Sequence, residues 1–284
     1  MSRFEEGFRP VVSVADALCC LYRPNHPHRE NGNMGRPPIG MNIIHRWLVG
    51  GLVMVLLQAD DNEEKLHYTV TLLKIPCVDV TMVNKTVEQN QMRLNFSAKT
   101  KNVFDYFFAI DNQYNTWYSS QTFQMTQYAS TINQPNADYS FKLSWNPETG
   151  KYATSKQSYS RPEGSHNIFS LLMRARKLPW EKLDTVWWPV EHDGKPYRGR
   201  YLWVESEDIA VGSEEVLADH YRLDLELDDG DNVELLEVSD VFSWGIVLDG
   251  CVRQLWIEKN GDRRILRAEV SVRGITLTAK LKSD

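Results

Sequence analysis

Beyond residue 65, the chain repeatedly alternates apolar and polar residues. This period of two is typical of half-buried β-strands, because successive side chains of a strand point to opposite faces of a sheet. The alternating stretches cover residues 66–72, 78–82, 92–98, 139–145, 221–227, 266–272 and 275–281. They predict a mainly β domain of about ten or more strands.

Turn-forming segments separate these stretches. Asn-Gly and Asp-Gly pairs tolerate the positive φ that tight hairpin turns require. Four segments are therefore predicted to be hairpin turns: NPETGK (146–151), HDGKPY (192–197), DDGDN (228–232) and KNGDRR (259–264). Short connections favour antiparallel neighbours, so we expect one curved antiparallel sheet, either an open barrel or a sandwich-like meander.

One segment has a helical period instead. Its apolar residues recur at i, i+3, i+4 and i+7: Ile168, Leu171, Leu172 and Ala175. Ser165 precedes them as a candidate N-cap. We predict one central helix at about 166–177, whose apolar stripe covers the concave face of the sheet as a plug or as a ligand lid.

Residues 41–59 have the character of a secretory signal peptide. A short start containing Arg46 precedes eleven uncharged residues, Trp47–Leu57, and Ala59 is followed by an acidic run. The apolar run is shorter than the about 20 residues that a membrane span needs, so no stable transmembrane segment is expected after cleavage near Ala59. The alternative is a buried core helix, which the adjacent Gly50 and Gly51 disfavour.

This interpretation divides the chain into three parts. Residues 1–40 have no strand or helix period and are rich in Pro, Gly, Asn, His and Arg. They are interpreted as a non-native extension upstream of a start at Met41, or else as a disordered arm. Residues 60–284 are predicted to form a single all-β domain, periplasmic or secreted.

The charge of the chain bears on its binding partners, and its cysteines bear on disulfide formation. The formal net charge is −6, and the acidic excess lies after residue 59, so the chain is not expected to bind nucleic acid. Cys77 and Cys251 are the cysteines that remain after cleavage. In an oxidising compartment they could form one disulfide, or stay as two free thiols.

The sequence contains no clear catalytic constellation. His67, His166, His192 and His220 have no metal-ligand spacing, and His166 and His192 are expected in surface or capping positions. Neither a nucleophile elbow nor a phosphate-binding glycine loop is present. We therefore predict no catalytic residues, no metal and no cofactor, and a function that is more non-enzymatic than enzymatic.

An aromatic segment, FDYFFAIDNQYNTWY (104–118), is the main candidate for ligand contact. Aromatic rings can stack on sugars while Asp105 and Asp111 accept hydrogen bonds from hydroxyls, although the same rings could simply fill the core. The candidate ligand-binding residues, from this segment and elsewhere, are Tyr106, Phe108, Tyr114, Trp117, Trp187 and Leu172.

The order of these features resembles a family of exported bacterial proteins, domain-of-unknown-function family 3108. The resemblance lies in EEKLHYTVTLLKIPCVDVTM, VFDYFFAIDNQYNTWYSSQTFQMTQYAS, NIFSLLMRARKLPW, VEHDGKPYRGRYLWVE and QLWIEKNGDRRILRAEVSVRGITLTAKL, and it covers about residues 63–283. It implies an envelope location and a curved β fold akin to periplasmic lipoprotein carriers. It supplies no catalytic residues.

Three hypotheses about function follow. The first is a non-enzymatic envelope protein that shelters an apolar or amphipathic ligand, such as a lipid, or acts in envelope upkeep. The second is a carbohydrate-binding or carbohydrate-active protein that uses the aromatic and Asp cluster at 104–118. The third is an interaction module for another envelope protein.

Overall fold

The computed structural model describes residues 63–101, 103–135 and 137–283, and the predicted extension 1–40 and signal peptide 41–59 lie outside them. The strands are β1 (Glu63–Leu72), β2 (Ile75–Glu88), β3 (Gln91–Thr100), β4 (Asp111–Ser119), β5 (Met125–Gln134), β6 (Ala137–Asn146), β7 (Lys151–Ala153), β8 (Ser158–Ser160), β9 (Trp187–His192), β10 (Lys195–Val211), β11 (Glu214–Leu227), β12 (Val252–Glu258), β13 (Ile265–Val272) and β14 (Ile275–Leu281). The helices are α2 (Val103–Phe107), α3 (Ile168–Lys177), α4 (Trp180–Leu183) and α5 (Val241–Val247).

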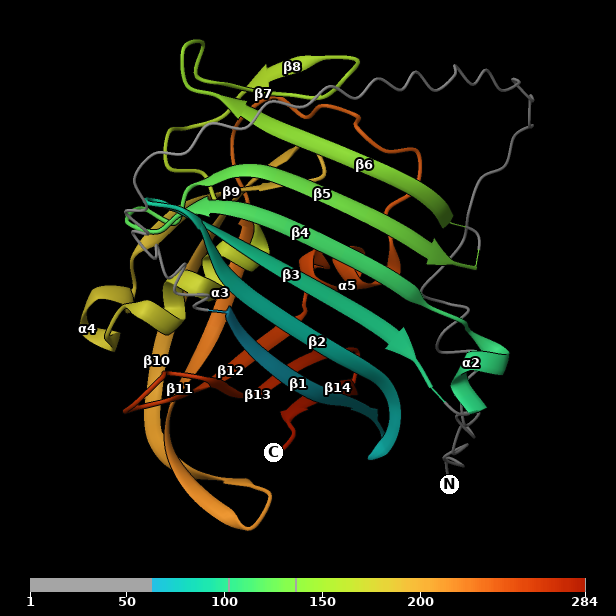
Figure 1. Cartoon of the computed structure of the whole chain (residues 1–284), viewed down its shortest axis with the longest axis vertical. Coiled ribbons are helices and arrows are strands. Elements are labelled where there is room, and N and C mark those ends of the chain that lie inside the picture. Colours follow the sequence, from blue (N-terminus) through green and yellow to red (C-terminus); the bar gives the residue numbers. More distant parts are fainter. Residues whose placement is uncertain (1–62, 102, 136, 284) are drawn as a thin grey trace, which may run out of the picture. The chain divides into compact units, whose positions relative to one another are not determined.

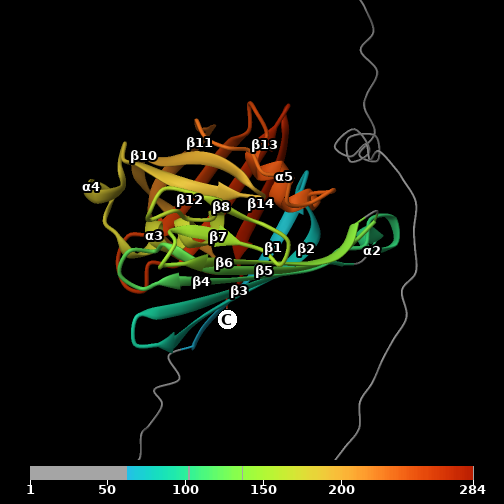
Figure 2. The same ribbon diagram turned by 90° about the horizontal axis from the view of Figure 1, so that it is seen from above.

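All fourteen of these strands belong to one sheet. Its order is β8-β7-β6-β5-β4-β3-β2-β1-β14-β13-β12-β11-β10-β9, and every neighbouring pair is antiparallel. The pairing of β1 with β14 joins the first half of the domain to its last strand. The sheet curves strongly, so that β1–β6 face β9–β12 across the interior (Figures 1 and 2). The predicted mainly β, curved antiparallel sheet is confirmed.

Three of the four predicted hairpin turns are confirmed, and they connect β6 to β7, β9 to β10 and β12 to β13. The prediction for residues 228–232 is wrong. These residues follow β11 and begin a loop that leads to α5. An Asp-Gly pair allows a turn, but a hairpin also needs a pairing strand directly after it, and the next residues do not form one.

The predicted central helix is present as α3 and lies inside the curve of the sheet (Figure 2). It begins at Ile168, with Asn167 as N-cap in a capping box with Ser170, so the predicted N-cap at Ser165 is wrong. Leu171 and Ala175 are fully buried, whereas Leu172 is only partly buried. The buried face supports the plug interpretation. The other helices have at most seven residues, too few to show a helical period.

The sheet does not close through paired strands, but the segment before α3 links one edge strand, β9, to the interior strand β5. His166 N–H donates to Pro189 O at 2.9 Å, and Glu191 N–H donates to His166 O at 2.7 Å. On its other side, Met125 N–H donates to Ser165 O at 3.0 Å. Residues 165–166 therefore connect edge strand β9 to the beginning of β5.

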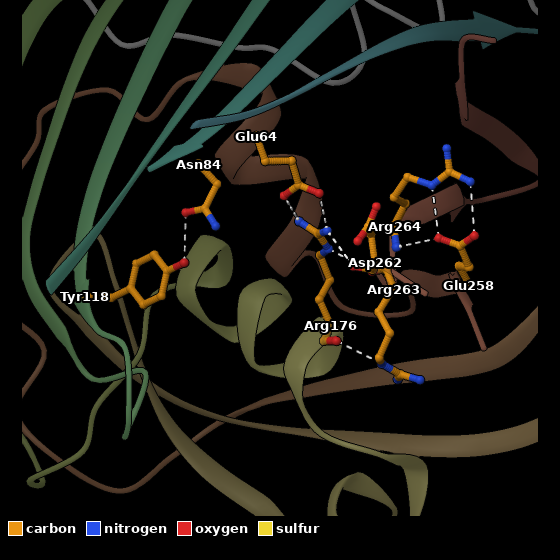
Figure 3. Close-up of polar contacts among 8 residues, drawn as sticks. All are labelled: Glu64, Asn84, Tyr118, Arg176, Glu258, Asp262, Arg263 and Arg264. Carbon is orange, nitrogen blue, oxygen red and sulfur yellow. Dashed lines mark hydrogen bonds and ion pairs between the residues drawn. The ribbon is translucent and has the colours of Figure 1, made fainter. Parts of the chain in front are cut away.

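The end of α3 is fixed by a buried charge. Arg176, 1% exposed, donates two hydrogen bonds of 2.6 Å to the carboxylate of Glu64 in β1 (Figure 3). It also donates to the backbone oxygens of Asp262 and Arg263 in the β12–β13 turn. One guanidinium thus joins the helix to both halves of the sheet.

Cys77 and Cys251 are both buried, and each is a free thiol. Burial raises the pKa of each thiol, which disfavours the reactive thiolate. Of the two alternatives for this pair, the structure has the free thiols. In the part of the chain that is described, none of the helices has the length and apolar character of a membrane span.

Candidate functional site

A cavity of about 370 Å³ lies beside the β9–β10 turn. The turn and β10 form one wall, and the loop before α5, with the end of α5 itself, forms the other. The lining residues are His192, Asp193, Lys195, Tyr197, Asn232, Val233, Glu234, Leu235, Leu236, Ser239 and Val247. The size lies at the lower end of the roughly 300–1,000 Å³ that is usual for small-molecule sites.

Gly194 allows the two walls to approach each other. Its φ is +82°, and a Cβ atom there would lie 1.9 Å from the backbone oxygen of Val233. Val233 N–H donates to Gly194 O at 2.8 Å, so the loop is hydrogen-bonded directly to the turn. A residue with a side chain would hold the loop away and change the shape of the cavity.

A buried ion pair stabilises the β9–β10 turn through hydrogen bonds to its backbone. Arg161 Nε donates to Glu191 Oε2 at 2.6 Å. Both side chains are buried, with exposed fractions of 3% and 2%. Glu191 Oε1 also accepts from Gly194 N–H at 2.6 Å, while Arg161 Nη2 donates to Gly194 O at 2.5 Å. Burial raises the pKa of Glu191, and the charge of Arg161 opposes that rise. The pair fixes the backbone that carries His192 and Asp193.

His192 lines the cavity and has a buried ring nitrogen without a hydrogen-bond partner. The side chain is 9% exposed, and its Nε2 forms no hydrogen bond with the described residues. Nε2 is 3.7 Å from Asp193 Oδ2, which accepts a hydrogen bond from Ser239 Oγ at 2.9 Å. Buried polar atoms are nearly always paired in native proteins, so Nε2 is available for a ligand or a water molecule.

The same two residues, His192 and Asp193, also line a second cavity, deeper between α3 and the β5–β6 pair. Its volume is about 20 Å³, enough for one water molecule. The His192 side chain therefore lies between the outer cavity and the core. The deeper space is too small for an acyl chain.

Aromatic side chains fill most of the interior. Phe169 of α3 packs against Phe96, Tyr114 and Phe242, with ring centroids 5.2–6.4 Å apart. The Tyr114 hydroxyl donates to Asp240 Oδ1 at 2.7 Å, and burial together with this carboxylate raises the pKa of Tyr114. Asp240 in turn caps α5 through two backbone N–H groups. The concave face of the sheet is thus covered by a packed core. The larger cavity lies outside this core, beside the β9–β10 turn.

The structure separates the residues that the sequence suggested as ligand contacts. Tyr106 is 88% exposed on α2, and Phe108 is partly buried just after it. In β4, Tyr114 points into the core, whereas Trp117 lies on the opposite face under Arg93. The two remaining candidates are also partly buried: Trp187 of β9, whose ring contacts the guanidinium groups of two arginines of β10, and Leu172 on α3.

These six candidates do not form one site, and none of them lines either cavity. The carboxylates proposed for sugar binding are engaged elsewhere: Asp105 accepts from Thr100 Oγ1 at 3.0 Å, and Asp111 pairs with Lys99 at 2.8 Å. Neither of these aspartates lines either of the two cavities described above.

The amino-acid sequence matches one protein-family model. The family described as "Protein of unknown function (DUF3108)" matches residues 67–282, which is most of the chain. The chain belongs to the DUF3108 family. The resemblance noted in the sequence is thereby confirmed. No curated protein matches it.

Two solved structures are similar to this DUF3108 chain at low identity. A β-barrel-like protein of domain-of-unknown-function family DUF1849 from Brucella abortus is 8% identical, with a TM-score of 0.47 over 76% of this chain and 94% of its own. The hypothetical lipoprotein YmcC from Escherichia coli is also 8% identical, with a TM-score of 0.31 over 77% of this chain and 83% of its own.

The sequence interpretation missed the cavity residues for two reasons. It expected His192 and His166 in surface or capping positions, because each adjoins a turn or a helix start, and a surface position is wrong for both. His192 is 8% exposed and His166 is 1% exposed. The second wall, residues 232–239, comes from a loop about forty residues further along the chain. The one local signal is the apolar run WWPV (187–190), which ends two residues before His192.

Proposed function

We propose that this DUF3108 chain is an exported, non-enzymatic envelope protein that binds a small amphipathic ligand in the cavity beside the β9–β10 turn. The observation that carries this proposal is the combination of an unpartnered His192 Nε2 with a mainly apolar opposite wall. Val233, Leu235 and Leu236 would contact the apolar part of the ligand. His192 and Lys195 would contact a polar or anionic head group.

The size of the cavity limits the ligand. About 370 Å³ accommodates one small amphiphile or one end of a longer chain. A lipid held wholly inside the curved sheet, as the sequence suggested, would need the space that α3 and the aromatic core fill. We therefore place the ligand beside the β9–β10 turn and not at the centre of the curved sheet.

The test is binding of the fluorescent amphipathic anion anilinonaphthalene sulfonate to purified full-length protein. Leu236→Trp should fill the cavity and weaken binding at least about tenfold. Leu236 is only partly buried, so its replacement is compatible with folding. Leu217→Trp is the matched control, because Leu217 is 39% exposed on β11 and does not line the cavity. Equal binding by both variants would contradict the proposal.

Export is the second part of the proposal and rests on the sequence of residues 41–59. Expression from Met41 in a bacterial host should give a periplasmic product whose first residue, read by N-terminal sequencing, is at or near Asp60. An intact product that retains Trp47–Leu57 in the cytoplasm would contradict export. The binding result does not depend on this one, so the two parts can fail separately.

A protein partner in the envelope is the alternative that a specific observation favours. α2 exposes Tyr106 at 88% and Phe107 at 73%, and the two rings contact each other with centroids 5.2 Å apart. Paired exposed aromatics are common at interaction sites. Cross-linking in the envelope should give an adduct with the wild-type chain and none when both are changed to Ser, if this alternative holds.

A further inference from the structure

Three potential metal ligands meet on the β10–β11 hairpin, away from the cavity. Glu205 and Glu207 lie on β10, and His220 lies on β11. Residues two apart on a strand point to the same side, and the hairpin register pairs Glu205 with His220 just after an irregularity in β10. One oxygen from each carboxylate and one ring nitrogen lie within 4.8 Å of one another.

The His220 ring is poorly satisfied by the protein itself. Both ring nitrogens are buried and neither has a partner at good hydrogen-bond geometry in the described part of the chain, although the Gln254 side chain of β12 lies close enough to interact with the ring. Nδ1 is 3.6 Å from Glu207 Oε1, which is too long for a normal hydrogen bond. A buried ring nitrogen beside two carboxylates, without a well-formed hydrogen bond to either, requires an explanation. A bound cation supplies one for all three residues.

Neighbouring residues orient two of the three ligands. The Trp256 ring stacks on His220, with centroids 4.2 Å apart and an interplanar angle of 12°. Its Nε1–H donates to Glu207 Oε1 at 2.5 Å. Metal sites commonly hold their ligands through such outer contacts. The nearby cation, Arg267, lies over the Trp256 ring and pairs with Glu269, so a carboxylate compensates its charge.

We propose that Glu205, Glu207 and His220 bind a divalent transition-metal ion of the zinc type. One imidazole and two carboxylates are ligands that Zn²⁺ accepts, at distances of about 2.0–2.2 Å. Closing the present spacing needs a small inward rotation, which the exposed Glu205 can make. Three protein ligands leave at least one position for water. The spacing of these residues in the sequence does not indicate a metal site, because the ligands meet only through the register of the hairpin.

The test uses the full-length chain, stripped with EDTA and titrated with Zn²⁺ by isothermal calorimetry. Other histidines, including His26 and His28, contribute equally to every variant, so the comparison between variants decides. His220→Ala should bind one equivalent fewer than the wild type. Glu205→Gln should weaken that equivalent at least about tenfold, and it keeps the test valid if His220→Ala does not fold.

The control is His67→Ala, an exposed histidine on β1 outside the cluster. It should keep the wild-type stoichiometry. A second readout is specific to the site: Trp256→Phe should keep the ring stack but lose most of the tryptophan fluorescence change that Cu²⁺ or Co²⁺ causes. Equal stoichiometry and affinity in wild type, His220→Ala and Glu205→Gln would overturn the proposal.

Discussion

Arg176 and Glu64 are 112 residues apart in the sequence, yet their side chains form two hydrogen bonds of 2.6 Å across the interior of the curved sheet. Arg176 is 1% exposed, whereas the Glu64 side chain is 32% exposed. Burying a guanidinium is favourable only when its charge is matched and its donors are satisfied. The pair therefore fixes where β1 meets the end of α3 (Figure 3).

Removing the carboxylate should destabilise the fold. Glu64→Ala leaves the Arg176 guanidinium with backbone acceptors in the β12–β13 turn but no counter-charge. Breaking a fully buried pair costs about 3–5 kcal/mol, and the partial exposure of Glu64 reduces this to about 2–3 kcal/mol. Urea unfolding measures the change. Glu63→Ala, at an exposed neighbour on the same strand, should stay within about 0.5 kcal/mol of wild type.

Two adjacent leucines of α3 distinguish a plug from a lid. Leu171 is 0% exposed and closely approaches Gly199 of β10, whereas Leu172 is only partly buried. Leu171→Ala should lower the free energy of unfolding by about 3–5 kcal/mol, and Leu172→Ala by about 1–2 kcal/mol. If α3 were a mobile lid, neither change would affect the unfolding midpoint appreciably.

The strands and α3 could be predicted because their signal is local. Each strand buries one face and α3 buries one stripe, so apolar residues recur with the period of the element. Where the elements meet is not local. The pairing of β1 with β14 and the approach of the 232–239 loop to Gly194 join segments far apart in the sequence.

Arg176 shows most clearly which contacts cannot be predicted from the local sequence. A basic residue in the last turn of a helix is usually an exposed partner of the helix dipole, and the sequence supports that interpretation. Its burial depends on Glu64 and on two carbonyl oxygens of a distant turn. The cavity and the Glu205–His220 pairing have the same cause: each requires the register of the folded sheet before its residues become neighbours.

His166 should make stability depend on pH. Burial and the nearby Arg174 charge lower the pKa of His166 from 6.5 to about 3. Between these values the unfolded chain binds a proton and the folded chain does not. The stabilisation is therefore fully present above pH 6.5 and is lost as the pH falls toward 3. At pH 5 the loss should be about 2 kcal/mol.

Urea unfolding at pH 7, 6 and 5 measures this dependence. His166→Gln should lower the stability at pH 7 and remove most of the additional loss between pH 7 and pH 5. His67→Gln, at an exposed histidine of β1, should keep the wild-type dependence. A His166→Gln variant with an unchanged slope would mean that other groups cause the acid sensitivity.

Gly194 and Gly274 offer a matched pair for testing how the cavity wall is held. Their φ angles are +82° and +84°, so an alanine has a similar backbone cost of about 1–2 kcal/mol at either position. A Cβ at Gly274 would meet nothing within 4 Å, whereas one at Gly194 would lie 1.9 Å from Val233 O. Gly194→Ala should therefore be more destabilising than Gly274→Ala by at least about 1 kcal/mol.

Gly194→Ala should also displace the loop that contains Val233. Binding of anilinonaphthalene sulfonate should therefore change in Gly194→Ala and remain at the wild-type level in Gly274→Ala. Equal stability of the two variants would show that the loop does not depend on its contact with the turn.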